Sequence, residues 1–281
     1  MQAGTRADQF RALIKAPEED ISLAEAALVF AGTVYDDIDV SRYLGRIDDL
    51  VATVNYISAP DSPLLERVNT LNDVLFEHEG YRGNSQDYSD PRNSFLNEVI
   101  DRKLGIPISL SALYLELGWR LDMELIGVSF PGHFLVKLQM EAGAIVLDPF
   151  HRGAVLDRHS LLRRMSGFVK DQRQAEALFG HVLKGATKKE ILARMLRNLK
   201  QIYAQDGVLE NALIAADLIC AALPGEAICL KERGELYEAL EVPALAAQDF
   251  AAYLQLSPDA ADASAIRERI VKLGAQRSPL N

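Results

Sequence analysis

Apolar residues recur three and four positions apart over most of the first 80 residues, which is the spacing of helices that bury one face. The pattern predicts helices within residues 7–57 and over 64–80, and Asp39 is placed to cap the helix that begins after it. Gly80 is a suitable helix end. The segment 80–94 breaks the pattern, because it is rich in Gly, Asn, Asp and Ser. A polar loop of this length inside a compact domain is often functional.

The pattern changes in the middle of the chain. Residues 93–104 are amphipathic, whereas residues 107–121 are apolar on nearly all sides, so the second of these helices should lie in the core. Runs of strand length follow, rich in Val, Ile, Leu and Phe. They are residues 124–130, 133–140 and 144–150, with a turn expected at 141–143. Helices followed by consecutive strands predict an α+β fold with a small antiparallel sheet.

Helical spacing returns from about residue 187, and the sequence then repeats with a period of 34 residues. The matched positions are Tyr203 and Tyr237, Ala212 and Ala246, and Pro224 and Pro258. Helix pairs with this period are typical of tetratricopeptide repeats. Only about two repeats fit, fewer than a free-standing array needs, so we expect the array to dock on the preceding domain. The sequence therefore predicts two domains, 1–184 and 185–281, the second of them all-α.

Composition and charge exclude several classes of function. The chain has 281 residues, of which 49% are hydrophobic and 25% are charged, as in globular proteins. Its net charge of −10 argues against a nucleic-acid-binding or anionic-lipid-binding surface. No segment has the ~18 consecutive apolar residues of a membrane span, and the N-terminus has no signal-peptide core. We therefore expect a cytoplasmic protein without a membrane partner. The only cysteines, Cys220 and Cys229, are too few for a disulfide framework or a zinc site.

Two side chains that can take part in acid–base catalysis lie at the ends of neighbouring predicted strands. His133 begins the run 133–140, and Asp148 ends the strand that follows the turn. If these strands pair antiparallel, the imidazole and the carboxylate lie side by side, as in sites where a carboxylate orients a general base. The helix that begins at Pro107 would point its N-terminus at the same place, where a nucleophile can be activated.

This order, a buried helix, a strand that begins with His and a strand that ends in Asp-Pro, resembles the transglutaminase-like (papain-like) core. The strings NSFLNEVIDRKLGIPISLSALYLE, FPGHFLVKL and LDPF are similar to those of the bacterial SirB-type family, which joins such a core to tetratricopeptide-like helices. The resemblance spans roughly residues 10–160 for the core and implies an α+β domain followed by a helical array. It also implies an association with gene regulation, which the acidic charge makes indirect. It brings no established reaction.

The chain departs from active transglutaminases at the nucleophile. Those enzymes place a cysteine at the start of the buried helix, whereas residues 105–109 read Gly-Ile-Pro-Ile-Ser here. Ser109 is the nearest hydroxyl, and Ser111 is the next. We therefore expect a non-catalytic, degenerate core in a cytoplasmic interaction or regulatory protein that binds a protein or peptide partner through its repeats. The alternative is a hydrolase or acyl-transfer enzyme that uses Ser109, His133 and Asp148.

Each of these residues also has a structural interpretation. Ser109 can satisfy free backbone groups in the first helical turn, and His133 with Asp148 can hold the sheet edge together.

A third hypothesis is that the former active-site cleft of the transglutaminase-like core binds a small molecule. His151 can join His133 on a metal ion, but two scattered histidines and one aspartate are weak evidence, so neither a metal nor a cofactor is expected. A group of polar residues either holds the 80–92 loop shut or lines a cleft: Arg92, Asn93 and Asn97.

Overall fold

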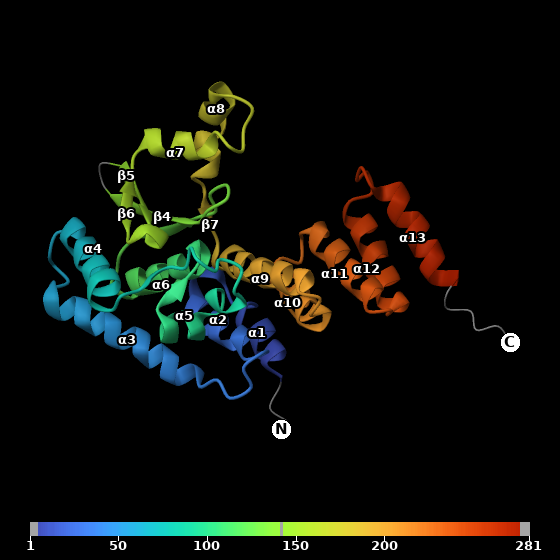
Figure 1. The fold of residues 1–281 in the computed structure, drawn as a ribbon, viewed down its shortest axis with the longest axis horizontal. Coiled ribbons are helices and arrows are strands. Elements are labelled where there is room, and N and C mark those ends of the chain that lie inside the picture. Colours follow the sequence, from blue (N-terminus) through green and yellow to red (C-terminus); the bar gives the residue numbers. More distant parts are fainter. Residues whose placement is uncertain (1–4, 141–142, 276–281) are drawn as a thin grey trace. The chain divides into compact units, whose positions relative to one another are not determined.

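The structure is a computed structural model that describes residues 5–140 and 143–275 (Figure 1). It forms two compact units: one is Pro17–Ile191, and the other combines the described residues of Met1–Ala16 and Leu192–Asn281. This grouping differs from the division expected at residue 184, because the first helix belongs with the C-terminal helices. The expected fold class is confirmed, since a small antiparallel sheet lies among the helices of the core and a helical array follows it.

The helices of the Pro17–Ile191 unit begin largely where the sequence predicts. Asp39 accepts the backbone N–H of Arg42 at 3.0 Å and so caps α3 as expected. The predicted 64–80 helix changes to a π-helical turn, η2 (Asp73–His78), before it ends. The α-helices are α2 (Leu23–Ala31), α3 (Val40–Ile57), α4 (Leu64–Asn72), α5 (Leu96–Arg102), α6 (Pro107–Arg120), α7 (Arg158–Met165) and α8 (Gln172–Val182). Short 3-10 helices are η1 (Glu18–Asp20), η3 (Pro91–Asn93) and η4 (Pro149–His151).

The sheet of this unit is a fully antiparallel one with strand order β6-β5-β4-β3-β7. Its strands are β3 (Leu125–Val128), β4 (Leu135–Met140), β5 (Gly143–Asp148), β6 (Ala154–Leu156) and β7 (Gly185–Ala186). A separate parallel pair joins β1 (Arg82–Gly83) to β2 (Leu104–Gly105). The predicted hairpin of β4 and β5 is present, although Glu141 and Ala142 of its turn lie outside the described residues.

Helices cover both faces of the sheet. Helix α6 packs on one face, and its residues from Pro107 to Gly118 are all buried, as its apolar sequence predicts. The opposite face packs against α7 and α8 through an apolar cluster that includes Val128, Leu135 and Leu161. In Figure 1 the green helix α6 and the yellow helix α7 accordingly lie on opposite sides of the strands.

The other unit is all-helical and repeats its own geometry. Left-handed residues at Gly207 and Glu241 follow the alternate helices Lys188–Gln205 and Ala227–Ala239, and each is followed by a valine whose N–H donates to a tyrosine carbonyl at 2.8 Å. These tyrosines are Tyr203 and Tyr237, so the 34-residue period of the sequence is a structural period. The helices are α1 (Arg6–Leu13), α9 (Lys188–Gln205, which begins in the other unit), α10 (Leu209–Ala222), α11 (Ala227–Ala239), α12 (Pro243–Leu256) and α13 (Ala263–Ala275).

Helix α1 packs on α10, and an ion pair between Arg11 and Asp217 joins them. Asp217 also accepts from Arg233 of α11, whose guanidinium forms two further bonds to Asp249 of α12, at 2.7 and 2.8 Å. One chain of charges therefore connects α1, α10, α11 and α12.

Both cysteines lie in these helices as free thiols, Cys229 buried and Cys220 partly so. No helix in the described part of the chain is long and apolar enough to cross a membrane.

Candidate functional site

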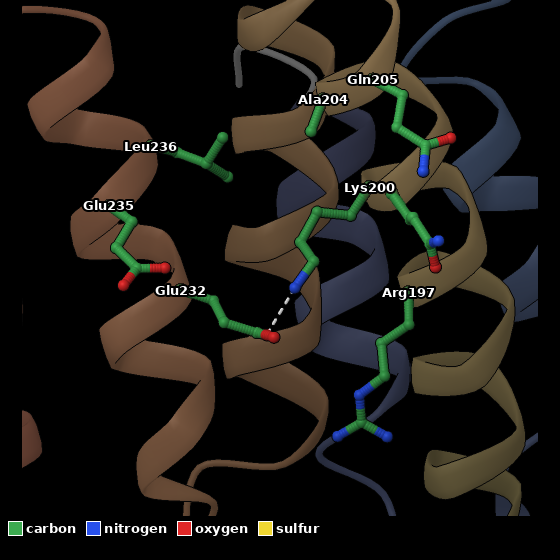
Figure 2. A pocket seen from close by; sticks show the side chains of 8 residues that line it. Arg197, Lys200, Ala204, Gln205, Glu232, Glu235 and Leu236 are labelled. Atoms are coloured by element: carbon green, nitrogen blue, oxygen red, sulfur yellow. Dashed lines mark ion pairs between the residues drawn. The ribbon is translucent and has the colours of Figure 1, made fainter. Parts of the chain in front are cut away.

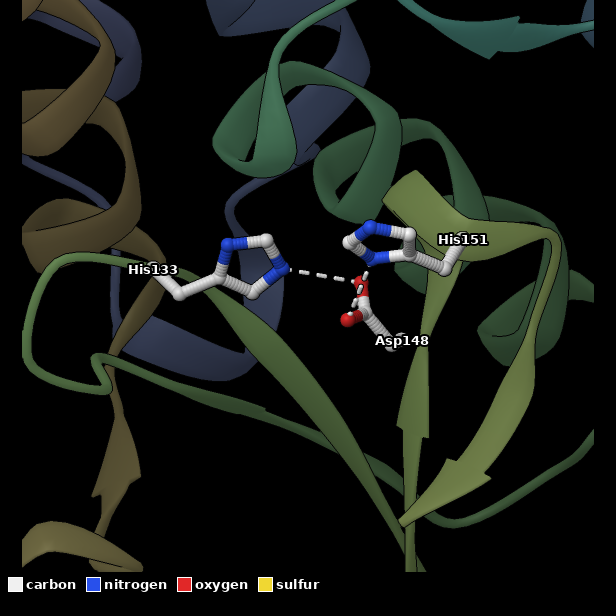
Figure 3. A group of neighbouring side chains, drawn as sticks. All are labelled: His133, Asp148 and His151. Atoms are coloured by element: carbon white, nitrogen blue, oxygen red, sulfur yellow. Dashed lines mark hydrogen bonds and ion pairs between the residues drawn. The ribbon is translucent and has the colours of Figure 1, made fainter. Parts of the chain in front are cut away.

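The sheet brings His133 and Asp148 together, as the strand pattern predicts. Val136 of β4 lies opposite Leu147 of β5, so the residues just before β4 reach the last residue of β5. His133 Nε2 lies 2.9 Å from Asp148 Oδ1 (Figure 3). The His133 side chain is 15% exposed, so solvent reaches this edge of the sheet.

Asp148 is the centre of the cluster. Its side chain is fully buried and is approached by three donor groups. His133 approaches one carboxylate oxygen, while His151 Nδ1 and Arg164 Nη1 approach the other, each at 2.8 Å. Burial opposes ionisation of the carboxyl, but the hydrogen bonds from His133, Arg164 and His151 outweigh it and hold the pKa of Asp148 well below its usual range. The carboxylate is therefore ionised at neutral pH.

His151 lies beside this pair, as a metal ion shared with His133 would require. The Asp-Pro-Phe-His segment turns as a 3-10 helix, which places His151 back over Asp148 three residues earlier. Its ring stacks on that of His133 at a centroid distance of 5.9 Å. Proline directly after an aspartate, in a segment that ends in histidine, is the local signal for this geometry. Arg164 comes from α7, far along the chain, and no local pattern indicates it.

The cluster is the kind that can hold a metal ion. The nitrogen atoms of His133 and His151 and an oxygen of Asp148 all lie within 4.8 Å of one another. Two imidazoles and one carboxylate are also the groups of a proton-transfer site. Metal binding needs an ion beside the two imidazoles, and proton transfer needs a reacting group there.

Ser109 is engaged elsewhere. Its hydroxyl is fully buried, accepts the N–H of Ile106 at 3.1 Å and donates to the carbonyl of Asn93 at 2.5 Å. Within the described residues, no hydrogen bond joins it to His133. Ser111 Oγ bonds the carbonyl of Phe134 at 3.4 Å. Both serines therefore satisfy backbone groups, and their catalytic role stays a prediction without a contact to support it.

Asn93 fastens the 80–94 loop at the start of α6. The side chain is fully buried, accepts from Asn84 Nδ2 at 3.1 Å and donates to the carbonyl of Asp87 at 2.7 Å. Arg92 pairs with Asp90 within the same loop. These bonds match the interpretation in which the polar residues hold the loop shut, and Ser109 is one of its attachment points.

The helical unit contains a second candidate site, a groove of about 620 Å³ between α9 and α11 (Figure 2). Helix α9 contributes Arg197, Lys200 and Gln201, and α11 contributes Glu232 and Glu235. Lys200 forms an ion pair with Glu232 across the groove. The α9 wall is therefore basic and the α11 wall acidic.

Comparison with known proteins connects both regions to described families. Residues 41–197 match the transglutaminase-like superfamily, and residues 199–271 match the tetratricopeptide repeat. The chain is 35% identical to a UPF0162 protein of Xylella fastidiosa over 95% of each chain. It is 31% identical to a UPF0162 protein of Pseudomonas aeruginosa, over 93% of this chain and 94% of that one. Protein SirB1 of Salmonella typhimurium is 25% identical, over 79% of this chain and 83% of its own. No solved structure matches.

Proposed function

This chain belongs to the SirB-type family, whose members join a transglutaminase-like domain to tetratricopeptide repeats, and on that basis we propose that it is a non-catalytic interaction protein with a regulatory role in the cytoplasm. The transglutaminase-like domain would serve as a scaffold. The helical repeats would bind a segment of a partner protein.

The state of Ser109 is the observation that carries the non-catalytic part. A serine nucleophile needs its proton directed at a base and its oxygen exposed to the substrate. The Ser109 hydroxyl is instead buried and donates to a backbone carbonyl. The imidazole of His133 and the carboxylate of Asp148 are correctly paired, but the described residues place no nucleophilic side chain in hydrogen bond with that imidazole.

The groove between α9 and α11 supports the interaction part. Stacked helix pairs form extended concave surfaces that bind peptides. The basic wall with Arg197 and Lys200 faces the acidic wall with Glu232 and Glu235, so the groove favours a peptide that carries charges of both signs. The side chains of Glu232 and Glu235 pair with Lys200 and Arg269, but they are 35% and 43% exposed, so a charged partner can reach them and compete for these ion pairs.

The proposal that the protein is non-catalytic is tested by labelling the purified protein with a serine-directed fluorophosphonate probe and a cysteine-directed iodoacetamide probe. We expect no fluorophosphonate adduct at Ser109 and iodoacetamide adducts only at Cys220 or Cys229. Variant His133→Ala is the matched control. Labelling at Ser109 that disappears in this variant would overturn the proposal and favour the hydrolase.

The interaction half is tested by placing a photo-crosslinking amino acid at Gln201 in the groove and, as a control, at Val271, which is 72% exposed on α13. We expect one partner to crosslink at Gln201 and not at Val271. The double variant Lys200→Glu/Glu232→Lys keeps the ion pair but reverses its direction, so it should lose the crosslink while keeping its melting temperature. Identical adducts at both positions, or adducts unaffected by the reversal, would refute groove binding.

A further inference from the structure

We propose that His133, Asp148 and His151 together bind one divalent transition-metal ion that prefers imidazole ligands, such as Zn²⁺ or Co²⁺. The proposed interaction function neither requires nor includes this site, so each can fail without the other. The three side chains come from separate segments that the fold already holds together, namely the loop before β4, the end of β5, and η4.

The distances between the potential ligand atoms suit a shared ion. Zinc binds nitrogen and oxygen ligands at about 2.0–2.2 Å in tetrahedral geometry, so two ligands on one ion are about 3.4 Å apart. The observed separations are 2.9 Å for His133 Nε2 to Asp148 Oδ1 and 2.8 Å for His151 Nδ1 to Asp148 Oδ2. Figure 3 shows both rings directed at the carboxylate that lies between them. An ion therefore needs small ring movements and no change of fold.

The protons can be placed without leaving a charge unpaired. A neutral imidazole carries its proton on either nitrogen, so when an ion binds, the proton of His133 can move from Nε2 to Nδ1 and that of His151 from Nδ1 to Nε2. Each ring then presents a lone pair at the atom that now lies near Asp148. An aspartate side chain is ordinarily ionised at neutral pH, so binding does not require Asp148 to lose a proton.

The ligand types define the class of ion, and the neighbouring charge limits the strength of binding. Arg164 neutralises part of the Asp148 charge, so an ion here keeps most of its own charge and binds more weakly than in a structural zinc site. Two nitrogen ligands favour zinc, cobalt, nickel or copper over magnesium and calcium, which prefer oxygen ligands. The His151 side chain is 56% exposed, which leaves water free to complete the coordination.

The experiment titrates Zn²⁺ into the full chain, without a histidine tag, by calorimetry, and follows Co²⁺ by its visible absorption. We expect one equivalent to bind, and His151→Ala to weaken binding by about tenfold or more. The matched control is His159→Ala, which removes an exposed histidine of α7 outside the cluster and should leave the affinity unchanged. Arg164→Gln should strengthen binding severalfold, because it removes the neighbouring positive charge.

Other outcomes overturn the proposal. They are an absence of saturable binding, binding that is unchanged in His151→Ala, or an equal loss in His159→Ala. His151 is mostly exposed, so its replacement should leave the fold intact even if His133→Ala does not fold. A Zn²⁺-dependent rise in melting temperature that is absent in His151→Ala gives a second, independent reading.

Discussion

Asp148 is the residue on which the sheet edge depends most. It receives hydrogen bonds from two histidines and an arginine of three different segments, so one carboxylate connects β5, η4 and α7 to the loop before β4. A buried acceptor with this many donors is costly to remove, because the donors are left without partners.

Replacement of this carboxylate should therefore destabilise the protein. We expect Asp148→Ala to lower the free energy of unfolding by about 1–3 kcal/mol, since it leaves the imidazole of His133 and the guanidinium of Arg164 without their acceptor. Urea denaturation followed by circular dichroism measures the change. Asp61→Asn, which alters an exposed carboxyl in a loop, is the control and should have little effect. Equal stabilities for wild type and Asp148→Ala would show that the cluster does not support the fold.

Acidification should remove the same stabilisation. The pKa of Asp148 is well below its usual range in the folded state, whereas an unfolded Asp titrates near ~3.9. Between these two pKa values the unfolded chain binds a proton that the folded chain does not, so the stabilisation is complete above about pH 4 and is lost as the pH falls through the folded pKa. The stability difference between wild type and Asp148→Asn should accordingly narrow from pH 5 to pH 3. A constant difference over this range would contradict the low pKa.

Part of this cluster was predictable from the sequence. The pairing of His133 with Asp148 follows from two neighbouring runs of strand length that pair antiparallel through the short turn at 141–143. Arg164 follows from neither, because it depends on how α7 packs across the sheet. For Ser109 the sequence indicates a place near the start of α6 but not the hydrogen-bond partners. In the structure its hydroxyl donates to the carbonyl of Asn93 and so attaches a loop.

Among the elements, those with strong apolar periods were predictable. Helix α6 and the 34-residue repeat are examples, because packing determines both. The sequence pattern does not predict α7, because its sequence, RHSLLRRM, has three arginines and a histidine among eight residues. The two-residue strands β1, β2 and β7 were also missed, because so short a strand carries no alternation.

The contact between α11 and α12 depends on a glycine. A Cβ at Gly234 would lie 2.8 Å from the Phe250 ring, whose side chain is fully buried, so Gly234→Ala forces the helices apart. We expect a loss of about 1–3 kcal/mol, measured by thermal or urea denaturation. Gly274 on α13 is the matched control: nothing lies within 4 Å of a Cβ there, and Gly274→Ala should stabilise by about 0.5–1 kcal/mol. Equal effects of the two substitutions would refute the close packing.

In the whole molecule, the grouping of α1 with α10 decides which fragments are stable. Phe10 of α1 is fully buried in the described structure, and Arg11 pairs with Asp217 of α10. A fragment that ends at residue 184 keeps α1 but loses α10, which exposes apolar surface. It also loses β7 of the sheet.

We therefore expect a fragment of residues 17–191 to be more soluble and less prone to aggregation than a fragment of residues 1–184. Size-exclusion chromatography and light scattering at equal concentration measure this difference. A monomeric 1–184 fragment as stable as the full chain would show that α1 needs no partner. It would also support the division at residue 184, which stays a prediction.

The same pairing of α1 with α10 has a consequence for biosynthesis. The ribosome makes α1 first and α10 only after the whole Pro17–Ile191 segment. At about 5–20 residues per second, α1 waits on the order of ten seconds or more before its partner helix emerges. During this interval the Pro17–Ile191 segment can fold while the apolar side of α1 stays uncovered. The nascent chain thus presents the apolar side chains of this eight-residue segment, which is too short to hold a helix alone, to chaperones until α10 emerges.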